Sequence, residues 1–228
     1  MGRIILVSGI DTDIGKTVCT GMLARYLHHN NLRVITMKLV QTGNDGFSED
    51  LAKHRELMGV PQFPEDAEGL TAPQIFHFPS SPHLAAALEH RVVDTAAIRR
   101  AAEELARRYD LVLAEAAGGL MVPLTPQLLT IDFAAQCGWQ TILVASGRLG
   151  SLNHILLSLE ACRHHRLPIA GIIYHRRATE DAAIADETAR FTRQWLRDHQ
   201  LPDRWAELPE IDFNSLPECD FSALSLDH

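Results

Sequence analysis

The sequence lacks long hydrophobic runs and paired cysteines. Its four cysteines are widely spaced and none forms a CxxC pair, so neither a zinc ribbon nor a disulfide framework is indicated, and we expect reduced, mostly buried thiols. The apolar start at residues 4–7 is too short for a signal peptide or a membrane span, and Asp11 and Asp13 follow it directly. These absences predict a cytoplasmic protein with no membrane partner.

Positive charge is also scarce. Lys and Arg total 21 against 29 Asp and Glu, which gives a net charge of -8 with His neutral. Such a balance disfavours attraction to the phosphates of nucleic acid, so we expect no nucleic-acid partner, and any anionic ligand must be held by local cations. Twelve histidines are present, but no HExxH spacing occurs, so a histidine metal site is not predicted.

Short apolar runs alternate with longer helical patterns along the chain. The runs at 3–8, 33–38, 111–115, 141–145 and 169–174 are apolar throughout, as strands buried on both faces are. Helices are predicted over 16–29, 48–58, 95–108, 152–165 and 181–200. The alternation predicts a three-layer α/β fold with a mostly parallel sheet, and the length suits a single domain over residues 1–228.

Three further segments carry local predictions. Thr95 is a suitable N-cap for the helix over 95–108. Residues 59–81 are rich in Pro, Gly and acidic residues with one short strand pattern at 74–78, which predicts a long excursion over the sheet edge, where binding loops are common. Residues 208–228 are expected to be irregular and either to wrap the surface or to fray.

A phosphate-binding loop follows the first predicted strand. Residues 9–17 read GIDTDIGKT and a helical pattern begins at once, which is the context that a P-loop requires. Backbone N–H groups around Gly15 can converge on a phosphate, Lys16 can bridge the β- and γ-phosphates, and Thr17 can offer its hydroxyl to Mg²⁺. Five residues separate Gly9 from Gly15, one more than in the strict Walker pattern. A chance GKT at a helix start is the alternative, but the preceding apolar strand argues against it.

Two other predicted strands end in charged residues. Glu115 precedes the Gly-rich residues 116–119, and the carboxyl ends of parallel strands face the ligand crevice, so Glu115 is a second candidate for Mg²⁺; a solvated strand-end glutamate is the alternative. Lys38 ends the second strand, where it could neutralise developing phosphoryl charge, although a lysine at a strand end is usually only exposed.

Five segments together resemble the dethiobiotin synthetase family. They are GIDTDIGKT (9–17), MKLVQTG (37–43), SSPHLAA (80–86), AEAAGGLMVPL (114–124) and RLGSLNH (148–154), in the family's order and spacing. The resemblance covers roughly residues 1–175, and the long gap in the phosphate loop is the family's own form. It implies a P-loop NTPase-like ligase that uses ATP and Mg²⁺ to carboxylate 7,8-diaminononanoate with CO₂ and to close the ring to dethiobiotin, through a carbamate and a carbamic–phosphoric anhydride.

The resemblance also implies roles for single residues. Lys38 is the catalytic lysine, while Thr12 and Lys16 contact the phosphates and the carbamate. The implied Mg²⁺ ligands are Thr17, Asp50 and Glu115, with Glu49 as an alternative to Asp50. The remaining nucleotide contacts are expected from Asp13, Ile14, Gly15, Val18, Ala116, Ala117, Gly118, His175, Arg176, Leu208, Pro209 and Glu210.

The diamine substrate has its own implied contacts. Thr42 matches the family's hydroxyl residue on this substrate. Leu149, Gly150 and Asn153 belong to a segment that resembles the family's site for the substrate carboxylate across a subunit interface, so a homodimer is implied.

His175 departs from the family, which has an asparagine that reads the adenine edge at this position. Each ring nitrogen of histidine makes one hydrogen bond, so paired recognition of the base is compromised and weaker base discrimination is expected. A satisfied surface histidine is the alternative.

Two rival functions share the phosphate loop. ParA- and MinD-like switch ATPases carry a lysine five residues before the GKT lysine, where this chain has Asp11, and they often end in a basic helix, whereas this tail is acidic. An inactive nucleotide-binding regulatory module is the second alternative, against which the presence of Lys38, Thr42 and Glu115 argues.

Overall fold

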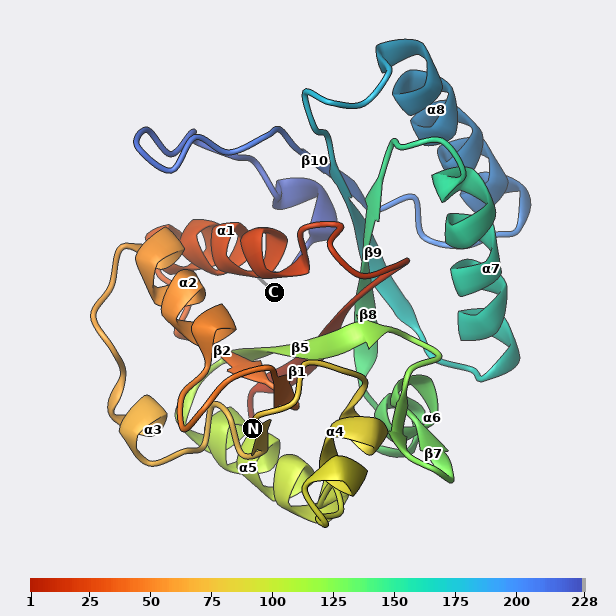
Figure 1. Cartoon of the computed structure of the whole chain (residues 1–228). Helices are drawn as coiled ribbons and strands as arrows, with labels where there is room; N and C mark the ends of the chain where they lie inside the picture. Colours follow the sequence, from red (N-terminus) through yellow and green to blue (C-terminus); the bar gives the residue numbers. More distant parts are fainter. Residues whose placement is uncertain (227–228) are drawn as a thin grey trace.

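A six-stranded sheet, parallel throughout, forms the middle layer of the structure, a computed structural model that describes residues 1–226 (Figure 1). Its strand order is β10-β9-β8-β1-β5-β2, and every adjacent pair runs in the same direction. The strands are β1 (Arg3–Gly9), β2 (Val34–Lys38), β5 (Leu111–Gly119), β8 (Gln140–Ser146), β9 (Ile169–His175) and β10 (Trp205–Leu208). The five predicted strands are confirmed, and β10 was not predicted.

Helices cover both faces of this sheet, as the apolar strands predict. One face carries α1 (Lys16–His29) and α2 (Glu49–Met58), and the other carries α5 (Thr95–Arg108), α6 (Thr130–Gln136), α7 (Ser151–His164) and α8 (Ala182–Asp198) (Figure 1). Ser48 caps the N-terminus of α2, where its hydroxyl accepts from the Leu51 N–H, and Gly59, with φ 70°, caps the C-terminus. The three-layer arrangement is therefore confirmed, and α6 is an addition to it.

The cap of α5 differs from the prediction. Asp94, not Thr95, is the N-cap residue, and its carboxylate accepts the Ala97 N–H at 2.8 Å. Thr95 already has helical geometry, so it stands one position too late to cap, and its assignment was wrong.

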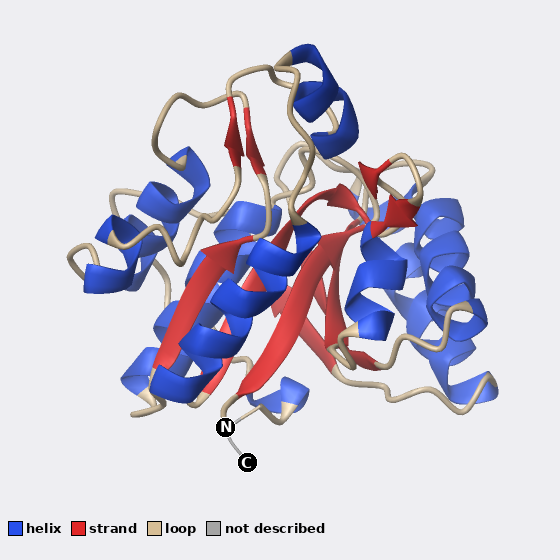
Figure 2. Cartoon of the chain, turned by 90° about the horizontal axis from the view of Figure 1, so that it is seen from below, coloured by secondary structure: helices blue, strands red, loops and turns tan. Residues whose placement is uncertain are grey.

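Residues 59–81 form the expected excursion beyond the edge strand β2. The Lys38 N–H donates to the Thr71 carbonyl at 2.7 Å, so the excursion covers the open edge of this strand. The strand predicted over 74–78 is only β4 (Ile75–Phe76), which pairs with β3 (Gln41–Thr42). Figure 2 shows the short pairs β3–β4 and β6 (Pro123–Thr125)–β7 (Leu128–Leu129) beyond the carboxyl ends of the main strands. The short helices α3 (Pro64–Ala67) and α4 (Pro82–Leu88) were not predicted.

The C-terminal segment wraps the surface and does not fray within the described residues. It ends in η1 (Ser222–Leu224), and both Phe221 and Leu224 are buried. The Phe221 ring packs edge-on against Tyr26 of α1 at 5.7 Å between ring centroids. Gly171 of β9 leaves the space for Leu224, since a Cβ there would lie 2.6 Å from the leucine Cδ2. Residues 227 and 228, the last two of the segment predicted to wrap the surface or to fray, lie outside the described residues. Residues 1–226 contain no helix long and apolar enough to cross a membrane.

Candidate active site

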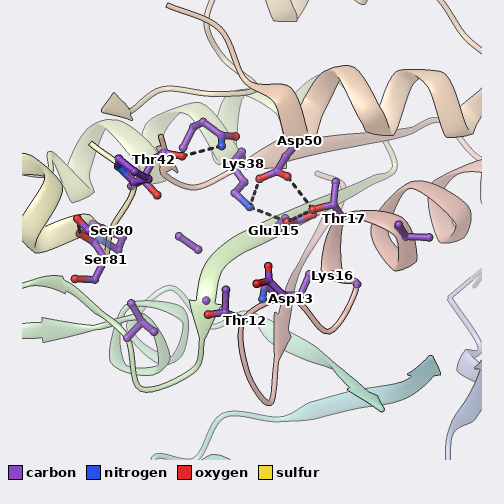
Figure 3. Close-up of a pocket in the computed structure, with 18 of the residues that line it drawn as sticks. Thr12, Asp13, Lys16, Thr17, Lys38, Thr42, Asp50, Ser80, Ser81 and Glu115 are labelled. Carbon is purple, nitrogen blue, oxygen red and sulfur yellow. Dashed lines mark hydrogen bonds and ion pairs between the residues drawn. The ribbon is translucent and has the colours of Figure 1, made fainter. Parts of the chain in front are cut away.

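A cavity of about 810 Å³ lies at the carboxyl ends of β1, β2 and β5 (Figure 3). The phosphate loop, residues 10–15, forms one wall, and residues 79–82 before and at the start of α4 form the opposite one. Because all strands of the sheet are parallel, their carboxyl ends meet at this single edge, which is where ligands bind in open α/β folds.

The phosphate loop depends on the glycine before its lysine. Gly15 has φ 93°, and a Cβ there would lie 2.3 Å from Nδ1 of His175, so this position admits no side chain. Lys16 follows at the start of α1 and is buried, and its ammonium donates to the Asp11 carbonyl at 2.8 Å. Burial lowers the pKa of Lys16, and nearby Glu115 partly opposes that effect. The lysine is thus folded over its own loop, with its ammonium at the cavity.

Four residues from distant parts of the chain meet at the floor of the cavity. The Lys38 ammonium lies 2.5 Å from Asp50 Oδ2 and 2.7 Å from Glu115 Oε1. The Thr17 hydroxyl lies 2.8 Å from Asp50 Oδ1 and 3.1 Å from Glu115 Oε1. Figure 3 shows these side chains, from β2, α2, β5 and α1, directed at one another. The structure therefore brings the predicted Mg²⁺ ligands and the predicted catalytic lysine together.

Lys38 and Glu115 are almost completely buried yet remain charged. Burial alone would lower the pKa of Lys38 and raise that of Glu115. The attraction between the two charges outweighs burial at both residues. Asp50 adds to it at Lys38, whose pKa is raised, and the hydrogen bond from His54 adds to it at Glu115, whose pKa lies below its usual range. The floor of the cavity is thus a fixed ion-pair cluster.

The oxygen donors of this cluster suit Mg²⁺. A threonine hydroxyl and two carboxylates are hard ligands of the kind that Mg²⁺ takes, and Mg²⁺ usually completes its shell with water and substrate phosphates. Within residues 1–226 no group of three or more His, Cys, Asp or Glu side chains could hold a metal ion, so the hydroxyl and a nucleotide phosphate would have to contribute. Asp50 reaches Thr17, whereas the exposed Glu49 has its backbone N–H bound to Asn44 Oδ1.

Comparison with known proteins decides the family. A family model described as an AAA domain matches residues 3–212. The ATP-dependent dethiobiotin synthetase BioD of Chlorobaculum tepidum is 47% identical over 94% of this chain and 88% of its own length. The ATP-dependent dethiobiotin synthetase BioD 2 of Haemophilus ducreyi is 45% identical over 87% of this chain and 94% of its own length.

This chain belongs to the dethiobiotin synthetase family.

Solved structures with low sequence identity to this chain support its fold alone. The ParA protein of pNOB8 bound to nonspecific DNA has a TM-score of 0.57 at 16% identity and covers 93% of this chain. Chloroplast FtsY of Physcomitrella patens has a TM-score of 0.56 at 17% identity, and this chain spans 65% of the FtsY chain. Both confirm a P-loop NTPase-like three-layer fold for this chain.

Most of the predicted residues line the cavity of this dethiobiotin synthetase family member. The predicted residues that do so are Thr12, Asp13, Gly15, Lys16, Thr17, Val18, Lys38, Thr42, Asp50, Glu115, Ala117 and Gly118. Ile14 and Ala116 are buried behind it, and the lining does not include Leu208, Pro209 or Glu210, which lie beside the end of β9.

The end of β9 differs from the prediction. His175 is buried, with 6% of its surface exposed, so the reading of it as a satisfied surface residue is wrong. Its Nδ1 donates to the Ile14 carbonyl at 3.0 Å, while Nε2 has no partner within residues 1–226. The Arg176 guanidinium is turned away from the cavity, because Glu207 and Asp186 bind it on the side of α8.

Arg177, the residue after Arg176, does face the cavity. It lines the cavity and donates to the Asp13 carbonyl of the phosphate loop. Sequence reasoning missed it, although the adjacent arginines after β9 gave a signal that one of the two could face the phosphates. Gln41, Ser80 and Ser81 also line the cavity, although no role was predicted for these three residues.

The predicted carboxylate-binding segment lies outside this cavity. Leu149, Gly150 and Asn153 are exposed at the start of α7, where Gly150 is the N-cap residue with φ 94°. Arg148 beside them pairs with Asp11 of the phosphate loop. Within one chain, therefore, this segment borders the phosphate loop but does not reach the space next to Lys38.

Proposed function

We propose that the chain uses ATP and Mg²⁺ to convert 7,8-diaminononanoate and CO₂ to dethiobiotin. Membership of the family supports this activity, and the observation that carries it to this site is the buried Lys38 ammonium beside the phosphate loop, held by Asp50 and Glu115. A switch ATPase needs no such fixed cation between its phosphate loop and a substrate-sized space.

The phosphate loop would hold the nucleotide. Its N–H groups and the start of α1 carry partial positive charge, and Lys16 and Arg177 add full charges at the cavity wall. A phosphate oxygen can replace the Asp11 carbonyl as the acceptor for Lys16. Bound Mg²⁺, held by Thr17, Asp50 and Glu115, would neutralise charge on the phosphate oxygens.

The reaction requires charge stabilisation more than covalent help from the protein. One substrate amine attacks CO₂ and loses a proton, which forms the carbamate. A carbamate oxygen then attacks the γ-phosphorus as the bond to ADP breaks, and the second amine attacks the carbonyl carbon and expels phosphate with loss of a proton. Negative charge is present on the carbamate and develops during phosphoryl transfer, and the Lys38 ammonium, whose pKa is raised, stays charged to stabilise it.

The walls of the cavity can orient the diamine. Thr42 and Ser81 line it on the side away from the phosphate loop, and Thr12 lines it from the loop itself (Figure 3). The hydroxyl groups can accept hydrogen bonds from the two amines, which would place them in the geometry that ring closure needs.

The active unit under this proposal is a homodimer. Leu149 is 83% exposed within residues 1–226, beside the N-terminus of α7, where backbone N–H groups can bind an anion. A second copy would bring this segment to the substrate carboxylate. Analytical ultracentrifugation at the assay concentration tests this point, and a monomer with full turnover would contradict it.

The test of the reaction is phosphate release with ATP, Mg²⁺ and bicarbonate, with and without 7,8-diaminononanoate, while dethiobiotin is followed by mass spectrometry. Release should depend on the diamine and match the product, and Lys38→Ala should lower it by at least about 100-fold. Lys53→Ala is the matched control, because Lys53 lies on α2 outside the cavity and pairs with Glu56. Phosphate release without the diamine would favour a switch ATPase, and nucleotide binding without turnover would favour a regulatory module.

A further inference from the structure

A histidine lies directly behind the proposed metal site. His54 of α2 is completely buried, and its Nε2 lies 2.8 Å from Oε2 of Glu115. The other carboxylate oxygen, Oε1, faces Thr17 and Lys38. Within residues 1–226, His54 is the only hydrogen-bond partner of Oε2, so the two oxygens of Glu115 have separate surroundings.

The direction of the hydrogen bonds follows from the groups involved. Arg55 has only donors, so the Thr36 hydroxyl accepts from its Nη1 at 2.7 Å. The proton of that hydroxyl is then available to His54 Nδ1 at 3.0 Å, while His54 Nε2 donates to the ionised Glu115. With the ring proton of His54 on Nε2, every group in the line of hydrogen bonds that runs from Arg55 through Thr36 and His54 to Glu115 is satisfied.

The outer end of this line of hydrogen bonds, at Arg55, is fixed as well. Arg55 binds Asp66 through two hydrogen bonds, at 2.9 Å from Nε and 2.7 Å from Nη2. Asp66 in turn accepts from Thr71, which lies in the excursion over the sheet edge. The outer end of this line of hydrogen bonds is therefore held by Asp66 and Thr71, which do not line the cavity.

The spacing on α2 connects this line to the other metal ligand. Asp50 and His54 are four positions apart, so they project from the same face of the helix. One helix thus supplies a proposed ligand, Asp50, and the donor that holds the other carboxylate, Glu115.

We infer that His54 is a positioning residue that fixes the Glu115 carboxylate with Oε1 toward the cation. The inference rests on the proposed nucleotide–metal site. A hydrogen-bond donor behind a metal-binding carboxylate restricts it to one orientation, and loss of such a donor typically lowers the metal affinity by about 10- to 100-fold. The carboxylate would otherwise be free to rotate and present either oxygen.

The experiment measures Mn²⁺ binding in the presence of saturating ADP, with free Mn²⁺ followed by electron paramagnetic resonance. His54→Leu removes the donor at similar volume, and the Mn²⁺ dissociation constant should rise by about 10-fold or more. His54→Gln keeps an N–H donor near the position of Nε2 and should stay within about threefold of wild type. ADP binding without metal, measured by calorimetry, should be the same in all three proteins, which a general loss of structure would not allow.

A second pair of variants keeps the test decisive if His54→Leu does not fold. Thr36→Val removes the hydroxyl that accepts from Arg55 and donates to His54, and it should weaken Mn²⁺ binding more than Thr36→Ser, which keeps the hydroxyl. Equal Mn²⁺ affinity in each pair overturns the inference and leaves the metal site standing. Failure of the wild-type chain to hold Mn²⁺ with ADP overturns the metal site itself, and the inference with it.

Discussion

Replacing Lys38 by methionine separates the structural task of this lysine from its chemical one. Methionine fills a similar volume but carries no charge. The variant leaves the Glu115 carboxylate completely buried beside Thr17 and His54, without the ammonium that lies 2.7 Å away in the wild type. Asp50 is less affected, since its side chain is 26% exposed and can be solvated by water.

The magnitude follows from the cost of breaking a buried ion pair. Removing one partner leaves an uncompensated charge and destabilises a protein by about 3–5 kcal/mol. Adding Glu115→Gln to Lys38→Met removes the second charge at nearly constant shape, so the double variant should return to within about 2 kcal/mol of wild type. Neither protein should make dethiobiotin at more than about 1% of the wild-type rate, because the cation at the reacting groups is missing in both.

Urea unfolding at neutral pH, followed by circular dichroism, supplies the free energies of unfolding, and the product assay supplies the rates. A Lys38→Met variant as stable as wild type would refute the buried ion pair. A double variant no more stable than the single one would refute the claim that the unpaired Glu115 charge is the cause. Recovered stability with no recovered turnover is the expected pattern.

Three further predictions concern pH, base selectivity and phosphate binding. Although burial opposes it, Lys38 holds the pKa of Glu115 below its ordinary 4.5, so the stabilisation from the Glu115 charge is complete above pH 4.5 and is lost progressively below it. In urea titrations, the difference in unfolding free energy between wild type and Glu115→Gln should therefore shrink from about pH 6 to about pH 3. A constant difference would contradict this. His175→Asn should raise the ratio of kcat/KM for ATP over GTP about fivefold, since an amide offers both a donor and an acceptor; an unchanged ratio would show that this residue does not read the base. Arg177→Ala should weaken ADP binding about 10-fold by calorimetry, whereas Arg190→Ala, an exposed residue of α8, should not; equal affinities would exclude a phosphate contact.

The central part of the fold could be predicted because its strands are apolar on both faces. All five residues of β2 are buried, including the lysine at its end, so the run stands out in the sequence. The edge strand β10 has only four residues and carries the exposed Glu207, so it gave no such signal. Asp94 and Thr95 are both good capping residues in adjacent positions, and sequence alone did not determine which of them begins α5.

The site was predictable where strand ends and the phosphate loop determine it. Lys38 ends β2 and pairs in register with Glu115 of the neighbouring parallel strand β5, so their meeting follows from the topology. His54 reaches Glu115 only because α2 packs against α1 and β2, and Arg177 reaches Asp13 only because of how the chain turns after β9. No local pattern encodes either of these long-range contacts.

The position of β1 at the middle of the sheet has a consequence for synthesis on the ribosome. This strand precedes the other five of the sheet in the chain, yet its two neighbours are β5 and β8, and Arg3 pairs with Leu111. Nearly half of the chain must therefore leave the ribosome before the strand that carries the phosphate loop gains a partner, and more must follow before Ile5 meets Gln140. Because such non-local pairing is slow, the apolar β1 must be protected from aggregation during this interval, and ATP can stabilise the nascent protein only after these partner strands have been made.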